Sequence, residues 1–158
     1  MKKLFILFTL FFLICSLSFA TEKSYTLHEL GTVITADNCK FSLNSIRWES
    51  GDNMFLTPDS GTKWLVLDCT IQNTSNETIF FSTMLFFNLF DKAGYAQNLT
   101  VYAPRKGNLD TSISPSQTVR GEVAYVVDES ASYWEFVFKP TVMGDDQFFY
   151  SIVKEQIK

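Results

Sequence analysis

The sequence predicts an all-β protein, an antiparallel sandwich or barrel, and three features of the chain carry that prediction. Apolar and polar residues alternate with a period of two along most of the chain after residue 20, which is the pattern of half-buried strands. Turn-forming residues interrupt this alternation about every ten residues, the usual spacing in all-β folds. No segment keeps the 3.6-residue period of an amphipathic helix.

The first half of the predicted domain is centred on one clear strand. Residues 62–72 place Leu65, Leu67, Cys69 and Ile71 on one face, because side chains alternate across a strand. The strand ends at a turn, 73–76, whose Asn, Thr and Ser side chains hydrogen-bond their own backbone. The other extended segments expected in this half are residues 25–30, 32–36, 39–48 and 78–81, with a loop rich in Gly, Asp, Ser and Pro at 49–61.

The second half continues with the same alternation. Residues 84–91 read as one strand that ends at the turn 92–94, and residues 118–127 alternate around a glycine at position 121. Prolines and glycines make most of residues 103–117 a loop. The remaining expected strands are residues 99–102, 133–138 and 148–153.

Residues 1–20 have the layout of a secretory signal peptide. Two lysines precede the apolar run 4–15, and the small residues Ser18 and Ala20 favour cleavage before Thr21. An uncleaved membrane anchor is the alternative, but the apolar run is short for one. Ile14 disfavours lipidation of Cys15, which needs a small residue before it. We therefore expect a single domain, residues 21–158, that is secreted or periplasmic, with no stable membrane anchor after cleavage.

The charge of this domain limits its partners. The chain has 13 Lys and Arg and 17 Asp and Glu; two of the lysines lie in the leader, so 11 basic residues face 17 acidic ones and the formal net charge is −6. An acidic surface repels nucleic acid and anionic lipid. The expected partner is instead an unidentified protein or envelope component.

Cys39 and Cys69 are the two cysteines that remain after cleavage. An even number of cysteines in an oxidising compartment favours a disulfide, and both lie on the apolar face of their strands. Two buried free thiols are the alternative, since a free cysteine packs as a small apolar side chain.

The residues that could carry chemistry are few. His28 is the only histidine and lies far from any nucleophile motif, so we expect no catalytic residues. One histidine and two cysteines cannot supply a zinc or copper site, and the acidic pair Asp145 and Asp146 lacks the spacing of a calcium loop. The sequence therefore predicts no metal site and no cofactor.

Exposed aromatic residues are the better candidates for an interaction surface. In residues 84–91, Met84, Phe86 and Phe90 share the face opposite Leu85, Phe87 and Leu89. If the leucine face is buried, the other face is an apolar patch that suits a partner. We expect such a surface at Trp64, Met84, Phe86 and Phe90, unless another part of the chain covers it.

Three segments together resemble a family of secreted bacterial immunoglobulin-like domains of unknown function, often labelled telomeric-repeat-binding-factor-like and grouped with extracellular immunoprotective antigens. The segments are TKWLVLDCTIQNTSN (62–76), FNLFDKAGY (87–95) and SPSQTVRGEVAYVV (114–127). Ser116 departs from the glycine that the family usually has after proline, and the cysteine pair is not a family hallmark. The resemblance implies an immunoglobulin-like antiparallel β-sandwich and carries over no catalytic residue.

The function expected from these observations is an exported, non-catalytic binding or protein-interaction module of the cell envelope. Its recognition residues would lie in the loops 49–61 and 103–117, since long loops in compact domains are often functional. The alternative is a periplasmic carrier of a small ligand or metal, which would need an aromatic-lined pocket. A secreted hydrolase is a third and weaker alternative, which would need clustered carboxylates.

Overall fold

The computed structural model describes residues 25–36, 38–51, 57–101 and 103–158. The predicted leader, its cleavage site and part of the loop 49–61 lie outside these residues. The elements are β1 (Leu27–His28), β2 (Val33–Thr35), β3 (Cys39–Glu49), β4 (Thr62–Asn73), β5 (Ile79–Phe81), α2 (Thr83–Phe86), β6 (Phe87–Asp91), β7 (Asn98–Thr100), β8 (Thr111–Ile113), β9 (Thr118–Asp128), β10 (Tyr133–Phe138), β11 (Phe148–Val153) and the 3₁₀ turn η1 (Lys154–Gln156).

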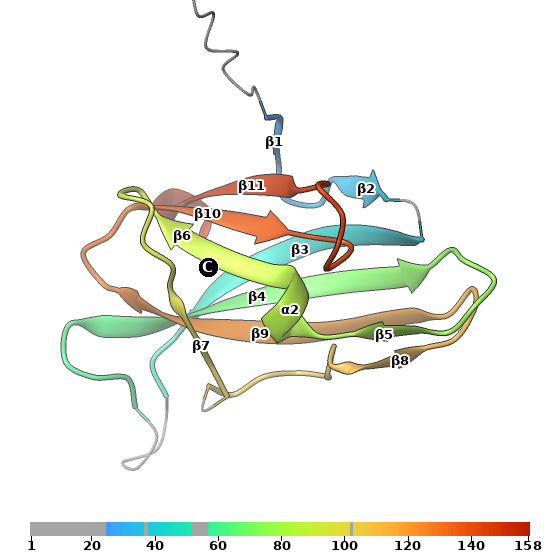
Figure 1. Ribbon diagram of the computed structural model, residues 1–158. Helices are drawn as coiled ribbons and strands as arrows, with labels where there is room; N and C mark the ends of the chain where they lie inside the picture. Colours follow the sequence, from blue (N-terminus) through green and yellow to red (C-terminus); the bar gives the residue numbers. More distant parts are fainter. Residues whose placement is uncertain (1–24, 37, 52–56, 102) are drawn as a thin grey trace, which may run out of the picture.

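The strands form two sheets that pack as layers (Figure 1). Sheet A has the order β1-β11-β10-β6, and sheet B has the order β2-β3-β4-β9-β7. A separate ribbon pairs β5 with β8. All pairs between these strands are antiparallel except β1 with β11, which is parallel. The predicted all-β, immunoglobulin-like antiparallel β-sandwich is therefore confirmed.

The core lies between the two sheets and contains the face of β4 that the sequence predicted to be buried. All four side chains of this face are fully buried: Leu65, Leu67, Cys69 and Ile71. They share the face because alternate side chains of a strand point to the same side. The largest fully buried side chains come from both sheets: Trp134, Tyr125, Tyr150, Phe41, Phe136, Phe138, Leu43, Ile46, Leu65, Leu67, Ile71 and Leu89.

The predicted disulfide between Cys39 and Cys69 is absent, and both residues are buried free thiols. Both face the core, as the alternation indicates, but the register of β3 against β4 separates them. Cys39 lies opposite Asn73, four residues along β4 from Cys69. Four residues of strand span about 13 Å, well beyond the separation of about 7 Å that a disulfide tolerates.

Two elements differ from the sequence prediction. Residues 84–91 do not form one strand, because Thr83–Phe86 make the helical turn α2 before β6 begins. The backbone N–H of Thr83 donates to the Asp110 carboxylate (2.7 Å), and so does the Thr83 hydroxyl. Thr83 and Asp110 are 27 residues apart in the sequence. The alternation of residues within 84–91 could therefore not predict this contact. The second difference is β8, which lies within the predicted loop 103–117.

Gly121 marks a close approach between β9 and the chain beside it. A Cβ atom at this position would lie 3.0 Å from Cγ of Leu109 and 3.1 Å from the backbone nitrogen of Asn108. The backbone N–H of Glu122 donates to the carbonyl of Lys106 (2.9 Å), which continues the edge contact beyond β7. The glycine within the strand is therefore a packing requirement of the segment that runs along it.

Asn73 connects the end of β4 to two other parts of the fold. Its side chain is buried, and its Nδ2 donates to the carbonyls of Ile113 (2.8 Å) and Glu77 (2.7 Å). Its Oδ1 accepts from the backbone N–H (2.9 Å) and the hydroxyl (2.8 Å) of Ser75. One carboxamide thus shapes the turn after β4 and connects the β5–β8 ribbon to sheet B. These contacts also provide the hydrogen-bond partners that a buried polar side chain needs.

We predict that Asn73→Ala lowers the free energy of unfolding by about 2–3 kcal/mol, because it leaves the buried carbonyl of Ile113 without this donor and removes the turn contacts. The measurement is a urea unfolding curve followed by tryptophan fluorescence. Asn76→Ala, at an exposed position of the same turn, is the control and should change stability by less than about 0.5 kcal/mol. Equal stability of the two variants would contradict this role of Asn73.

Candidate functional site

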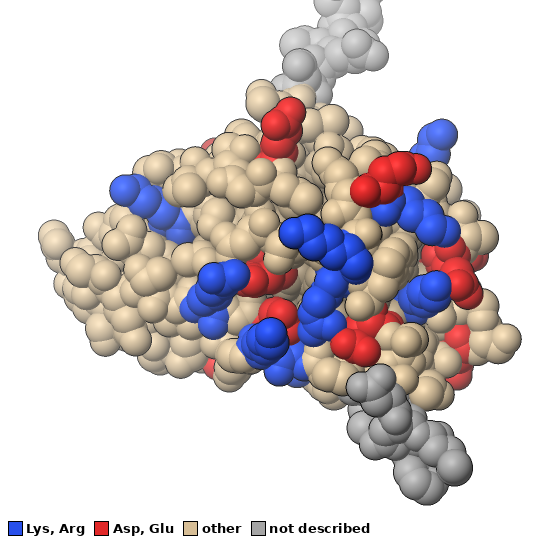
Figure 2. All heavy atoms as spheres, turned by 180° about the vertical axis from the view of Figure 1, so that it is seen from behind, with Lys and Arg blue, Asp and Glu red and all other residues tan. Residues whose placement is uncertain are grey.

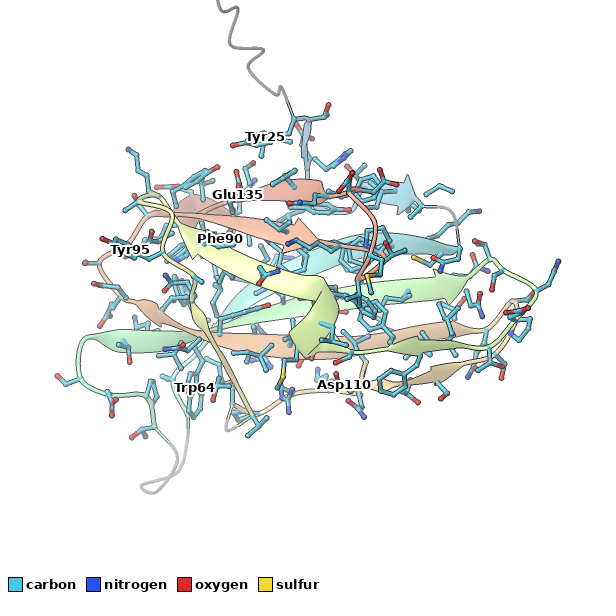
Figure 3. All side chains as sticks on the ribbon, in the orientation of Figure 1. Tyr25, Trp64, Phe90, Tyr95, Asp110 and Glu135 are labelled. Carbon is cyan, nitrogen blue, oxygen red and sulfur yellow. The ribbon has the colours of Figure 1, made fainter. Side chains whose placement is uncertain are left out.

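The outer face of sheet A carries a row of aromatic side chains. Glu135 in β10 lies opposite Phe90 in β6 and opposite Ser151 in β11, so these residues share one face with Phe149. Tyr25 covers the end of this row: its ring lies 4.3 Å from that of Phe149, centroid to centroid. Figure 3 shows Tyr25, Glu135 and Phe90 following one another down the front of the sheet.

Tyr25 is held in place by its neighbours on this face. Its hydroxyl donates to Oε2 of Glu135 (3.2 Å). The Glu135 carboxylate raises the pKa of the Tyr25 hydroxyl, first through its charge and then through the hydrogen bond, because both favour the protonated phenol. The short parallel pair of β1 with β11 brings Leu27 opposite Phe149 and His28 opposite Tyr150.

A hollow of about 650 Å³ opens beside β1, and we call it the N-terminal hollow. Its lining residues are Tyr25, Thr26, His28, Asp145, Asp146, Gln147, Phe148 and Phe149. The His28 ring lies 6.1 Å from that of Phe148, so aromatic rings form much of the wall. The chain between β10 and β11 supplies Asp145 and Asp146, and neither carboxylate pairs with any residue that the structure describes.

The outer face of sheet B has a different character. Figure 2 shows Lys and Arg side chains gathered in the middle of the face seen from behind, with acidic side chains between them. Arg47 donates to Glu122 (3.0 Å) and to Glu49 (2.6 Å), and Nε of Arg120 donates to Oδ1 of Asp68 (2.9 Å). The hydrogen bond from Arg120 is the main reason that the pKa of Asp68 is lowered.

A second hollow, of about 520 Å³, lies within this network. Its charged side chains form ion pairs with one another and hydrogen bonds with the neighbouring backbone. Glu122 also accepts from the backbone N–H of Lys106 (2.7 Å), and Arg47 donates to the carbonyl of Pro104 (2.9 Å). The network therefore fastens the start of the predicted recognition loop 103–117 to the sheet, which is a structural use of its charges.

The structure separates the four residues predicted as one interaction surface. Trp64 is 3 % exposed and packs with Val66, Ala103 and Ala124 on the outer face of sheet B. Phe86 is 9 % exposed and belongs to the core, whereas Met84 on α2 is 78 % exposed. Phe90 is half-buried on sheet A, away from Trp64 (Figure 3). The expected shared face does not form, because α2 breaks the alternation and the chain around Ala103 covers Trp64.

Sequence reasoning missed the N-terminal hollow as a unit. It singled out His28 and the pair Asp145 and Asp146 separately, and it gave Tyr25 and Phe149 no role. The parallel pairing of β1 with β11 joins these parts of the chain, and no local sequence pattern reports such a pairing. Among the residues that the structure describes, no group of three or more His, Cys, Asp or Glu side chains is placed to hold a metal ion.

Within the described residues, no helix is both long enough and apolar enough to span a bilayer.

Residues 28–148 match the family described as Domain of unknown function (DUF4352). A comparison with curated protein sequences finds no match.

Solved structures share the fold. The ycdA protein of Bacillus subtilis, named as a candidate lipoprotein, superposes with a TM-score of 0.65 at 16% identity; the match covers 78% of this chain and only 39% of that one. A β-sandwich protein of Clostridium difficile gives 0.58 at 16% identity, covering 83% and 97%. The secreted protein MPT63 of Mycobacterium tuberculosis gives 0.57 at 9% identity, covering 82% and 99%. At these identities the likeness shows the fold alone.

We predict that both thiols are inert in the folded protein. Burial raises the pKa of Cys39 to about 11 and raises that of Cys69 well above its usual value, so both stay protonated at pH 8 and are also inaccessible. Iodoacetamide should add nothing to the native exported protein, and two adducts after unfolding in guanidinium without reductant, as measured by intact mass.

The control for this labelling is Ser112→Cys, which places a thiol at an exposed position of β8 and should gain one adduct in the native state. Two cysteines that are labelled only after reduction would show a bridge and would require a different register between β3 and β4.

Proposed function

The chain belongs to the family described as Domain of unknown function (DUF4352), and from that premise we propose that it is an exported, non-catalytic binding module of the cell envelope. The narrower grouping with extracellular immunoprotective antigens, and a secreted or periplasmic location, are parts of the same proposal. The leader layout at residues 1–20 supports export, with cleavage before Thr21.

The observation that carries the binding role is the N-terminal hollow together with the aromatic row beside it. Binding sites are concave, largely apolar and aromatic, and contain a few polar groups that set specificity. The hollow combines Tyr25, Phe148 and Phe149 with two carboxylates that pair with no residue the structure describes, and it lies where β1 and the chain before β11 meet. The packed sandwich is the scaffold that carries these segments and their recognition residues at its rim.

The non-catalytic part of the proposal is supported by the state of the nucleophiles. The thiols of Cys39 and Cys69 are buried in the core with raised pKa values, which suits packing and opposes nucleophilic attack. His28, the only histidine of the sequence, lies 6.1 Å from Phe148 and 5.6 Å from Tyr150, centroid to centroid, so its described ring neighbours are aromatic rather than nucleophilic.

The hollow also favours a small ligand, or a small group of a larger one, over a flat protein surface. Its volume of about 650 Å³ lies in the range of small-molecule sites. This is the observation that supports the carrier version of the proposal, in which the chain binds a free small molecule.

Export is tested by the intact mass of the native protein from the host's extracytoplasmic fraction. We predict a chain that begins at Thr21, because the small residues before it suit signal peptidase. A mass that retains residues 1–20 would show an anchored protein instead.

The binding role is tested by cosedimentation of the exported protein with a washed envelope fraction from the same cells. We predict that Tyr25→Ser combined with Phe149→Ser weakens retention by about tenfold or more, because it removes two aromatic walls of the hollow. Tyr95→Ser is the matched control: Tyr95 is 73% exposed and is not a lining residue.

Circular dichroism and the melting temperature establish that the variants are folded. Retention of the double variant at the level of the wild type would overturn the role of the hollow. A wild-type protein that does not sediment would overturn the envelope role and leave the carrier version.

A further inference from the structure

We propose that the N-terminal hollow binds an organic ammonium group, the positively charged end of a small amine or quaternary amine. This inference rests on the proposed binding function and specifies the chemistry of its ligand. It follows from three features of the hollow: the material of its walls, the sign of its charge, and the absence of cationic partners among the described residues around it.

Aromatic side chains form part of the walls, since Tyr25, His28, Phe148 and Phe149 are among the eight lining residues. The Tyr25 and Phe149 rings lie against each other with a centroid distance of 4.3 Å and a tilt of 34°, and both line the hollow. Tyr25 is 53% exposed, so its ring is open to a ligand. A cation within about 6 Å of such a ring is attracted by the negative potential of the ring face.

The charge of the hollow is negative. Asp145 and Asp146 line it directly, and Glu135 lies at its border, where its Oε2 accepts the Tyr25 hydroxyl. Among the lining residues that the structure describes there is no lysine or arginine. An anionic ligand would be repelled by these carboxylates, whereas a cation gains Coulomb energy from them.

The carboxylates of the hollow differ from those of the charge network on sheet B. On that face Asp68, Glu49 and Glu122 each pair with an arginine. Asp145 and Asp146 accept no hydrogen bond and form no ion pair with the residues that the structure describes. They are therefore free to pair with a ligand.

An organic ammonium group fits the hollow better than a metal ion does. Hard cations need six or more oxygen ligands at fixed distances, and the described residues hold no metal-binding cluster. An alkylated ammonium group carries apolar surface for the aromatic walls and a diffuse charge for the carboxylates. Recognition of quaternary ammonium by aromatic rings is an established use of this contact.

The test is a titration of the ¹⁵N-labelled exported protein, followed by amide chemical shifts at constant ionic strength. One arm uses choline chloride, a second uses butylammonium chloride, and a third uses 3,3-dimethylbutan-1-ol, the neutral isostere of choline. We expect saturable shifts at residues 25–28 and 145–149 with either cation and none with the alcohol. Tighter binding of choline would identify a quaternary ligand, and tighter binding of butylammonium a primary amine.

Two charge variants separate the hollow from general electrostatics. Asp145→Asn with Asp146→Asn should weaken cation binding at least about fivefold, because it neutralises the carboxylates that line the site. Glu77→Gln with Glu155→Gln removes the same net charge at exposed positions and should leave binding unchanged. Glu155 follows the far end of β11, about 20 Å along the chain from Phe148.

The outcomes distinguish this inference from the function on which it rests. If the alcohol binds as well as choline, or if the Asp145 and Asp146 variant binds choline as tightly as the wild type, the ammonium assignment is wrong. Envelope retention that still depends on Tyr25 and Phe149 would then leave the proposed function intact. No response to any of the three compounds, together with no such retention, would overturn both.

Discussion

The sandwich depends on one aromatic cluster that joins its two sheets. Phe41, from β3 of sheet B, lies 4.3 Å from Phe138, 5.5 Å from Phe87 and 6.0 Å from Phe136, centroid to centroid, and all three of these rings belong to sheet A. Aromatic pairs of this kind add to the free energy of apolar burial. Because strands of both sheets meet at Phe41, the cluster fixes which faces turn inward and hence which residues remain outside.

A bulge in β3 sets the second constraint. The register of β3 on β4 shifts between Leu43 and Ser45, and the extra residue Asn44 donates to Asp68 (3.1 Å) and Thr70 (2.9 Å) on the outer face. The shift moves the inward positions from odd to even numbers, so that Ile46 follows Leu43 into the core. The outer polar network and the inner packing of β3 are therefore consequences of one inserted residue.

The sequence could predict the features that depend on neighbouring residues. The alternation in 62–72, the turn at 73–76 and the strand 133–138 report local geometry, and the structure confirms them. It could not predict the separation of Cys39 from Cys69, because alternation gives a face and not a register. The sequence could not predict the N-terminal hollow either, since the hollow depends on the pairing of β1 with β11, which are more than a hundred residues apart.

The wall of the N-terminal hollow includes β1, a strand that few contacts hold to the sheet. The ladder of β1 is only two residues long, and beyond it the stack of Tyr25 on Phe149 and the bond to Glu135 hold the segment. Elements with few contacts open at low free-energy cost. A cation that touches both Tyr25 and Asp145 bridges this segment to the chain before β11. Binding of such a cation therefore adds to the few contacts that hold β1 on β11, and so stabilises this part of the fold.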